Sequence, residues 1–149
     1  MKTIVLDTGP LGMVSNPKSS LENHACKQWL EDQVSAGARV VVPEIADYEV
    51  RRELLRANKT AGLARLEAVE AALDYLPITT AIMRQAAELW ATVRQQGQST
   101  AADKALDGDV ILAAQALSLG LPDTDFVIAT DNVGHLSRMS PAQRGQDIT

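Results

Sequence analysis

The sequence is poor in cysteine and in aromatic residues. Its single cysteine, Cys26, has no partner for an internal disulfide, and no Cys/His spacing predicts a zinc site, so we expect a small core residue. Aromatic residues make up 3% of the 149 residues, although hydrophobic residues make up 46%. The core must therefore consist of Ala, Val, Leu and Ile, a composition that favours helices packed in tight layers on a sheet, the α/β class.

The sequence also lacks long hydrophobic runs and an excess of positive charge. No stretch approaches the length of a membrane-spanning helix, and the first apolar run is too short for a signal peptide. We therefore expect a cytoplasmic protein with no membrane partner. A net charge of −5 argues against a protein that coats nucleic acid with bulk positive charge. It does not exclude a nuclease, because carboxylates gathered in one site add negative charge and bind cations.

The length predicts one domain over residues 1–149, with a tail that frays from about residue 140. Apolar runs without polar alternation predict buried strands of a mainly parallel sheet at residues 4–6, 38–43 and 126–130. A short strand at 75–78 is weakened by Pro77. Loops are predicted at residues 13–18 and 97–100.

Apolar periodicity and capping residues predict helices between these strands. They run from 19 or 20 to about 36, from about 44 to 58–60, around 63–73, from 79 or 80 to 96, and from 107 or 109 to a stop at 120–122. In the second, Ile45, Tyr48, Leu54 and Leu55 are candidates for the buried face. The last is apolar nearly all round, which predicts a place deep between layers.

Carboxylates stand at the ends of the predicted strands. Asp7 follows the first strand, Asp131 follows the strand at 126–130, and the apolar helix opens on Asp107 and Asp109. Because the carboxyl ends of parallel strands face the ligand crevice, we expect these side chains to converge if the two strands are neighbours. A strand-ending Asp also begins ordinary turns, so a single one carries little weight.

A fourth acid comes from the helix after Val42 and Pro43. Its Glu49, Arg52, Glu53 and Arg56 share one stripe by their i, i+3, i+4 spacing. Four carboxylates held together without cations would repel one another and resist ionisation. The grouping therefore indicates a site for a hard divalent metal with oxygen ligands, Mg²⁺ or Mn²⁺.

Four segments in series resemble the PIN domain family, and more narrowly the VapC-type toxins of bacterial toxin-antitoxin pairs. They are residues 4–8, residues 41–43 with Glu49 six residues after the proline, residues 109–116, and residues 127–132. The resemblance covers about residues 1–136 and implies a three-layer α/β/α sandwich with a central, mainly parallel sheet. It further implies a Mg²⁺- or Mn²⁺-dependent endoribonuclease that hydrolyses RNA phosphodiester bonds. The implied partners are an RNA substrate and a small cognate antitoxin, with a homodimer as an open alternative.

By matching position, the resemblance assigns an acidic quartet as catalytic residues and metal ligands: Asp7, Glu49, Asp109 and Asp131. Three accessory residues flank it: Thr8, Asp107 and Thr130. Asp109 is favoured over Asp107 as the third ligand because its offset from the alanine pair at 113–114 matches the family pattern. Asp103 and a helix-capping role for either acid stay open, because a capping Asp and a ligand Asp look identical in one sequence. Thr8 and Thr130 fit equally well as turn and strand-end residues.

The densest basic patch adjoins Glu49 and comprises Arg51, Arg52, Arg56 and Lys59. Arg52 and Arg56 are interpreted as contacts to RNA phosphates, with a plain solvated helix face as the alternative. Neither histidine, His24 or His135, has a recognisable partner, and both are expected to be structural or solvent-facing.

Other functional classes fit less well. A haloacid-dehalogenase-like phosphatase would carry a second acid where this sequence has Gly9, and a phosphoryl-accepting receiver domain would carry an acidic pair beside its first strand. The stronger alternative is a PIN-fold binding module with weak or no nuclease activity. An intact acidic quartet favours the nuclease.

Overall fold

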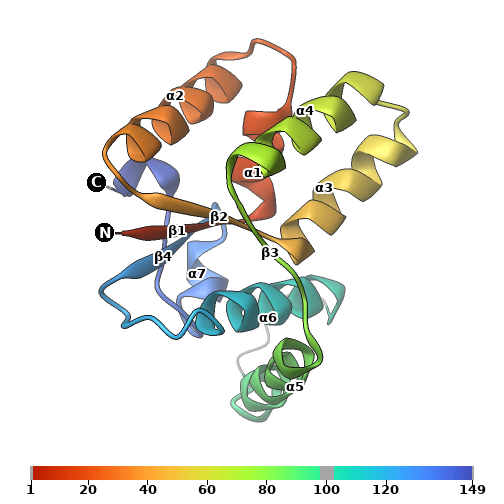
Figure 1. Cartoon of the computed structure of the whole chain (residues 1–149). Helices are drawn as coiled ribbons and strands as arrows, with labels where there is room; N and C mark the ends of the chain where they lie inside the picture. Colours follow the sequence, from red (N-terminus) through yellow and green to blue (C-terminus); the bar gives the residue numbers. More distant parts are fainter. Residues whose placement is uncertain (1, 98–102, 149) are drawn as a thin grey trace.

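The computed structural model describes residues 2–97 and 103–148 and is organised around a parallel sheet (Figure 1). Its described strands are β1 (Thr3–Leu6), β2 (Arg39–Pro43), β3 (Asp74–Leu76), β4 (Phe126–Ala129) and β5 (Ala142–Gln143), in the order β3-β2-β1-β4-β5. Every pairing between them is parallel. The central strand β1 therefore has β2 and β4 as neighbours, and the carboxyl ends of all three reach the same edge.

Helices cover both faces of the sheet and make the expected three layers. Above the sheet in Figure 1 lie α1 (Thr8–Ser15), α2 (Leu21–Ser35), α3 (Glu44–Arg56) and α4 (Thr60–Ala72). Below it lie α6 (Asp103–Leu117) and α7 (Val133–Leu136), and α5 (Thr80–Gln95) packs on the outer side of α6. Within the described residues, no helix is long and apolar enough to cross a membrane.

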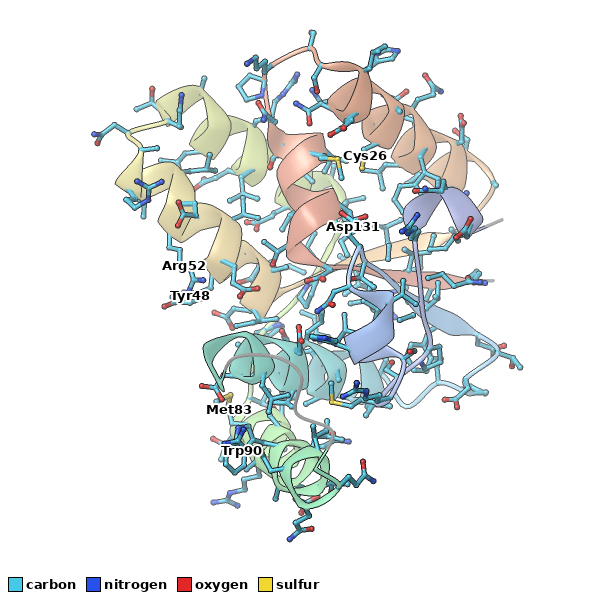
Figure 2. The ribbon with its side chains drawn as sticks, turned by 180° about the vertical axis from the view of Figure 1, so that it is seen from behind. Cys26, Tyr48, Arg52, Met83, Trp90 and Asp131 are labelled. Atoms are coloured by element: carbon cyan, nitrogen blue, oxygen red, sulfur yellow. The ribbon has the colours of Figure 1, made fainter. Side chains whose placement is uncertain are left out.

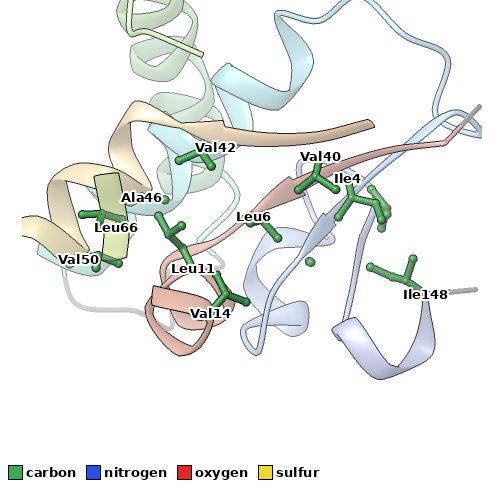
Figure 3. Close-up of a cluster of buried hydrophobic side chains, with 12 residues drawn as sticks. Ile4, Leu6, Leu11, Val14, Val40, Val42, Ala46, Val50, Leu66 and Ile148 are labelled. Atoms are coloured by element: carbon green, nitrogen blue, oxygen red, sulfur yellow. The ribbon is translucent and has the colours of Figure 1, made fainter. Parts of the chain in front are cut away.

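The pleat of the strands divides the core into two clusters. Ile4 and Leu6 of β1 belong to the cluster under α1 and α2, shown in Figure 3, whereas Val5 belongs to the cluster against α6. The residues of β4 alternate in the same way, with Val127 and Ala129 in the first cluster. This two-residue period explains why the strand sequences are apolar without interruption, since both faces are buried.

The first helix was not expected. Residues 13–18 were predicted to be a loop, but α1 begins at Thr8, directly after Asp7, and continues to Ser15. Asp7 caps this helix, because its Oδ1 accepts a 2.7 Å hydrogen bond from the Thr8 backbone N–H. Pro10 lies in the first turn, where a missing N–H leaves no hydrogen bond unmade. The Thr-Gly-Pro sequence therefore starts a helix rather than a turn.

Two further expectations need correction. Helix α6 begins at Asp103, so Asp107 and Asp109 lie inside it and neither is its cap; the predicted break at 97–100 falls mostly outside the described residues. The tail from residue 140 was predicted to fray, but β5 pairs with β4, and a 3₁₀ turn at Gly145–Asp147 packs on α2. Ile148 is buried in the core cluster of Figure 3, which supplies the apolar contact that holds the tail.

A buried glutamine fixes α6 against the start of α3. Gln115 is fully buried, and its Oε1 accepts a 3.1 Å hydrogen bond from the Ile45 backbone N–H in the first turn of α3. Its Nε2 donates to the Leu76 carbonyl of β3 at 2.8 Å. The side chain satisfies one of the N–H groups that every helix start leaves without an intrahelical partner. It therefore sets the position of α6 relative to α3, and both helices contribute to the site described below.

An ionic cluster joins α3 to α4. Arg51 contacts Asp47 at 3.0 Å, Glu67 at 3.1 Å and Glu70 at 3.4 Å. Burial raises the pKa of Glu70 to about 8, and the adjacent Asp47 carboxylate adds to that increase. The pKa of Asp47 is lowered, because hydrogen bonds from Glu70 and Arg51 outweigh its own burial. Glu70 is therefore the proton carrier of this cluster, and Arg51 is engaged within it.

Glu70→Gln should flatten the pH dependence of stability. The pKa of Glu70 is about 8 in the folded protein against 4.5 for an ordinary glutamate, so its contribution to the free energy of unfolding is complete below about pH 4.5. That contribution is lost as the pH rises through about 8. Gln stays neutral, so the Tm of the variant should fall less than that of the wild type between pH 5 and pH 8.5. Glu53→Gln, at an exposed position of α3, is the control, and identical slopes for Glu70→Gln and wild type would contradict the assignment.

Candidate active site

Asp7 lies at the carboxyl end of β1 and faces α6. Its backbone N–H donates to the Ala129 carbonyl at 3.0 Å, and its Oδ2 accepts a 2.7 Å hydrogen bond from the buried hydroxyl of Thr130. The register that pairs Leu6 with Ala129 continues to Asp7 and Thr130. By the pleat, both side chains point to the same side as Val5 and Ile128, toward α6. Asp7 therefore holds the α1 start with one oxygen and Thr130 with the other.

Glu49 reaches the same edge from α3. Its Oε1 accepts a 2.7 Å hydrogen bond from the Thr8 hydroxyl, one residue after Asp7. Its Oε2 lies 3.8 Å from a guanidinium nitrogen of Arg52. A Cβ on Gly108 would come within 2.9 Å of that same Oε2, so the backbone of α6 lies close to the Glu49 carboxylate. The Asp-Gly-Asp sequence thus places α6 directly against Glu49.

Asp109 reaches this edge from α6 and is largely buried. Its side chain is 14% exposed, and its Oδ2 accepts a hydrogen bond from Asn132 at 3.2 Å and lies 3.7 Å from His135 Nδ1. Burial raises the pKa of Asp109 to about 6, and the negative charges of Asp7 and Glu49 add to that increase, while His135 opposes it. The three carboxylates therefore share one electrostatic environment.

Asp131, the fourth predicted acid, follows Thr130 beyond the end of β4, and its membership of the quartet stays a prediction. Its side chain lies on the side of α1 and Cys26 (Figure 2). A Cβ on Gly9 would lie 3.0 Å from its Oδ2. Burial raises the pKa of the Cys26 thiol to about 11, with a contribution from the Asp131 charge. Asp131 and Cys26 both line a cavity of about 460 Å³.

Two site residues escaped the sequence analysis. Asn132 donates to Asp109 through its side chain, and its backbone N–H donates to the Thr130 hydroxyl at 2.8 Å. His135, predicted to have no partner, lies on α7 beside Asp109. Asn132 stands in the matched 127–132 segment and could have been found by applying the strand alternation beyond Thr130. Nothing local in the sequence connects His135 to Asp109, because the contact joins separate elements.

The remaining predicted residues divide between the site and the surface. Asp107 is exposed and lines a groove of about 400 Å³ between α5 and α6, because residues two apart on a helix face opposite sides. Arg56 pairs with Glu53 at 2.9 Å, and both side chains are exposed. Arg52 alone of the two predicted phosphate contacts lies beside a site carboxylate.

A groove opens next to Thr8 and Glu49. It has a volume of about 770 Å³ and lies between α1, α3 and the start of α4. Its lining is apolar at Val50 and Leu54 and basic at Lys59. A substrate or partner segment can therefore approach Glu49 along the α1–α3 interface.

The donor set at this edge suits a hard divalent cation in chemistry. Asp7, Glu49 and Asp109 offer only carboxylate oxygens, the ligands that Mg²⁺ and Mn²⁺ prefer. Among the described residues, however, no three His, Cys, Asp or Glu side chains already stand close enough to enclose a metal ion. Thr8, Thr130 and Asn132 currently donate to these carboxylates.

Comparison with protein families identifies this architecture. The PIN domain family model matches residues 4–139. The chain belongs to the PIN domain family. A search of curated protein sequences finds no significant match.

Solved structures support the same fold for this PIN domain. VapBC2 from Rickettsia felis, bound to a DNA fragment from its promoter, aligns with a TM-score of 0.73 and 14% identity over 95% of this chain and 98% of that one. FitAcB from Neisseria gonorrhoeae aligns with a TM-score of 0.72 and 18% identity, over 97% and 99%. VapBC-1 from nontypeable Haemophilus influenzae aligns with a TM-score of 0.63 and 18% identity, over 97% of this chain and 99% of that one. At these identities the likeness establishes the fold.

Asp109→Asn should raise the Tm in EDTA, because it removes a buried charge from beside Asp7 and Glu49. Its Tm should also rise less on addition of Mg²⁺, because the folded variant should bind the ion more weakly and weaker binding stabilises less. Thermal melting with and without Mg²⁺ measures both effects. Asp107→Asn removes an exposed charge two residues away on the same helix and is the matched control, with an unaltered Mg²⁺ response. A full Mg²⁺ response in Asp109→Asn would remove Asp109 from the metal-binding site.

Proposed function

We propose that this PIN domain is a Mg²⁺- or Mn²⁺-dependent endoribonuclease of the VapC type, the toxin of a toxin-antitoxin pair. The observation that carries the proposal is the approach of Asp7, Glu49 and Asp109, from β1, α3 and α6, to one edge of the sheet. The negative charges of Asp7 and Glu49 help to raise the pKa of Asp109, and this repulsion destabilises the folded state. The same negative charges favour the binding of a divalent cation.

The proposed reaction is hydrolysis of an RNA phosphodiester. A divalent cation held by Asp7, Glu49 and Asp109 would supply activation of a water and neutralisation of charge on the phosphate. Thr130 orients Asp7, Asn132 orients Asp109, and the Thr8 hydroxyl orients Glu49. The described site needs no Ser or Cys nucleophile, because the attacking group is water.

The proposed partners follow from the structural relatives. The aligned structures are of VapBC and FitAcB complexes, and one is bound to promoter DNA. By analogy we propose a small cognate antitoxin as the partner of this chain and the cytoplasm as its place of action. The groove of about 770 Å³ beside Glu49 is large enough for a peptide segment. A homodimer is a further proposal, and light scattering of the purified chain tests it.

The acids should rank in a definite order in a cleavage assay with unpaired RNA and Mg²⁺. Asp7→Asn, Glu49→Gln and Asp109→Asn should each lower the rate by at least ~100-fold, the scale for losing a group that positions a catalytic cation. Asp131→Asn should have an effect of the same size, whereas Asp107→Asn, an exposed position on another face of α6, should cost less than about tenfold. Asn preserves the shape of each Asp and can still cap a helix, so folding is checked by circular dichroism.

Two results would overturn this scheme. Cleavage that survives exhaustive EDTA treatment would exclude the metal mechanism. A folded protein that binds RNA or an antitoxin but cleaves nothing in Mg²⁺ or Mn²⁺ would establish the alternative, a PIN-fold binding module.

We also propose that Arg52 and Arg56 contact RNA phosphates. Each lost phosphate contact lowers the slope of log affinity against log salt by about 0.7 for a single strand. Arg52→Ala should show this decrease fully, because Arg52 lies beside Glu49, and Arg56→Ala should show it less, because Arg56 is one turn farther along α3. Anisotropy titrations of labelled RNA over a salt series give the slopes. An unchanged slope in both variants would leave both arginines as plain surface residues.

A further inference from the structure

An exposed tyrosine stands next to the candidate active site. Tyr48 precedes Glu49 on α3, was expected to be buried, and is instead 55% exposed. That exposure exceeds the 42% of Tyr75 and the 36% of Trp90, in a chain with five aromatic residues. The core therefore does not account for an aromatic side chain at this position.

Tyr48 is connected to the site through Arg52. The guanidinium carbon of Arg52 lies 5.1 Å from the centre of the Tyr48 ring, and its Nη2 lies 3.8 Å from Glu49 Oε2. Figure 2 shows Tyr48 and Arg52 together at the edge of the molecule, beside α6. The ring, the guanidinium and the carboxylate thus form a continuous contact along α3, from the surface to the acids.

Such a pair has a specific chemical preference. An aromatic ring and a guanidinium plane both stack on the faces of unpaired nucleobases, whatever the base. A duplex keeps its bases stacked inside and offers this pair only phosphates. A ligand with a flat, partly apolar ring can stack on the tyrosine, and an adjacent phosphate on the same ligand can contact the arginine. A single-stranded nucleotide has both properties.

We infer that Tyr48, held in place by Arg52, is a stacking platform for the unpaired nucleobase next to the scissile phosphate. This inference rests on the proposed ribonuclease function and adds the substrate conformation and the residue that selects it. In this proposal the Tyr48 ring is not a ligand of the divalent cation. It is therefore a binding residue, separable from the acids that carry the chemistry.

The test uses the full chain and short single-stranded RNA, with affinity measured by anisotropy in EDTA and cleavage measured in Mg²⁺. Tyr48→Ala should weaken binding about fivefold to a hundredfold and raise KM more than it lowers kcat, the scale of one lost base stack. Tyr48→Phe, which keeps the ring, should bind within about twofold of wild type. Because Tyr48 is uncharged, the salt slope of Tyr48→Ala should equal that of wild type.

Two controls separate stacking from general damage. Leu55→Ala alters the same helix at an almost equally exposed position, 57%, and should change neither affinity nor KM. A series of RNAs, each with one abasic site, removes single bases and keeps every phosphate. At one position the abasic site should lower the affinity of wild type, whereas the affinity of Tyr48→Ala should be the same with and without that base. Circular dichroism confirms folding of each variant.

The outcomes distinguish this inference from the proposed function. If wild type neither binds nor cleaves RNA, both fail. If wild type cleaves and Tyr48→Ala matches it in affinity and KM, only the stacking platform fails. The stacking platform would also be overturned if Tyr48→Ala bound the intact RNA and every abasic RNA more weakly than wild type by the same factor. So would a shift from dimer to monomer in Tyr48→Ala with unchanged RNA binding, because the face would then be an interface between copies.

Discussion

The pairing of β1 with β4 is the constraint on which the site depends. It places Asp7 opposite Thr130, so that a buried hydroxyl holds the carboxylate at 2.7 Å, and it brings α7 and Asn132 to the same edge. The same carboxylate caps α1, which carries Thr8 to Glu49. A shift of β4 by one residue would exchange Thr130 for Asp131 beside Asp7 and place two charges together. The register thus decides which side chain lies beside Asp7.

The close approach of α6 to α3 is the second requirement. Gly108 leaves room for Glu49, and the fully buried Gln115 ties α6 to the first turn of α3. These contacts act at two points about two turns apart on α6, one near its start and one near its end. Together they hold Asp109 at the same edge as Asp7 although α6 itself lies under the sheet.

The sequence predicted the parallel sheet, its buried strands and three converging acids, because each depends on local patterns: apolar runs and the carboxylates that follow them. It could not decide where the Asp131 side chain points, since the direction of a side chain beyond a strand end depends on the local backbone and on an unknown strand pairing. Tyr48 and Leu55 were expected inside, but both face solvent, at 55% and 57% exposed. His135 and Gln115 act through contacts with distant elements, which a single sequence does not display.

The Asp7–Thr130 contact also has a consequence for folding order. It joins residues 123 positions apart, whereas the Thr8–Glu49 contact spans 41. Contacts between distant parts of a chain pay a larger loop-closure entropy and tend to form late. The N-terminal part can therefore assemble β1, α1 and α3 while Asp7 still lacks its partner strand. Completion of the acidic edge coincides with insertion of β4, so a partly folded chain carries the acids without their working geometry.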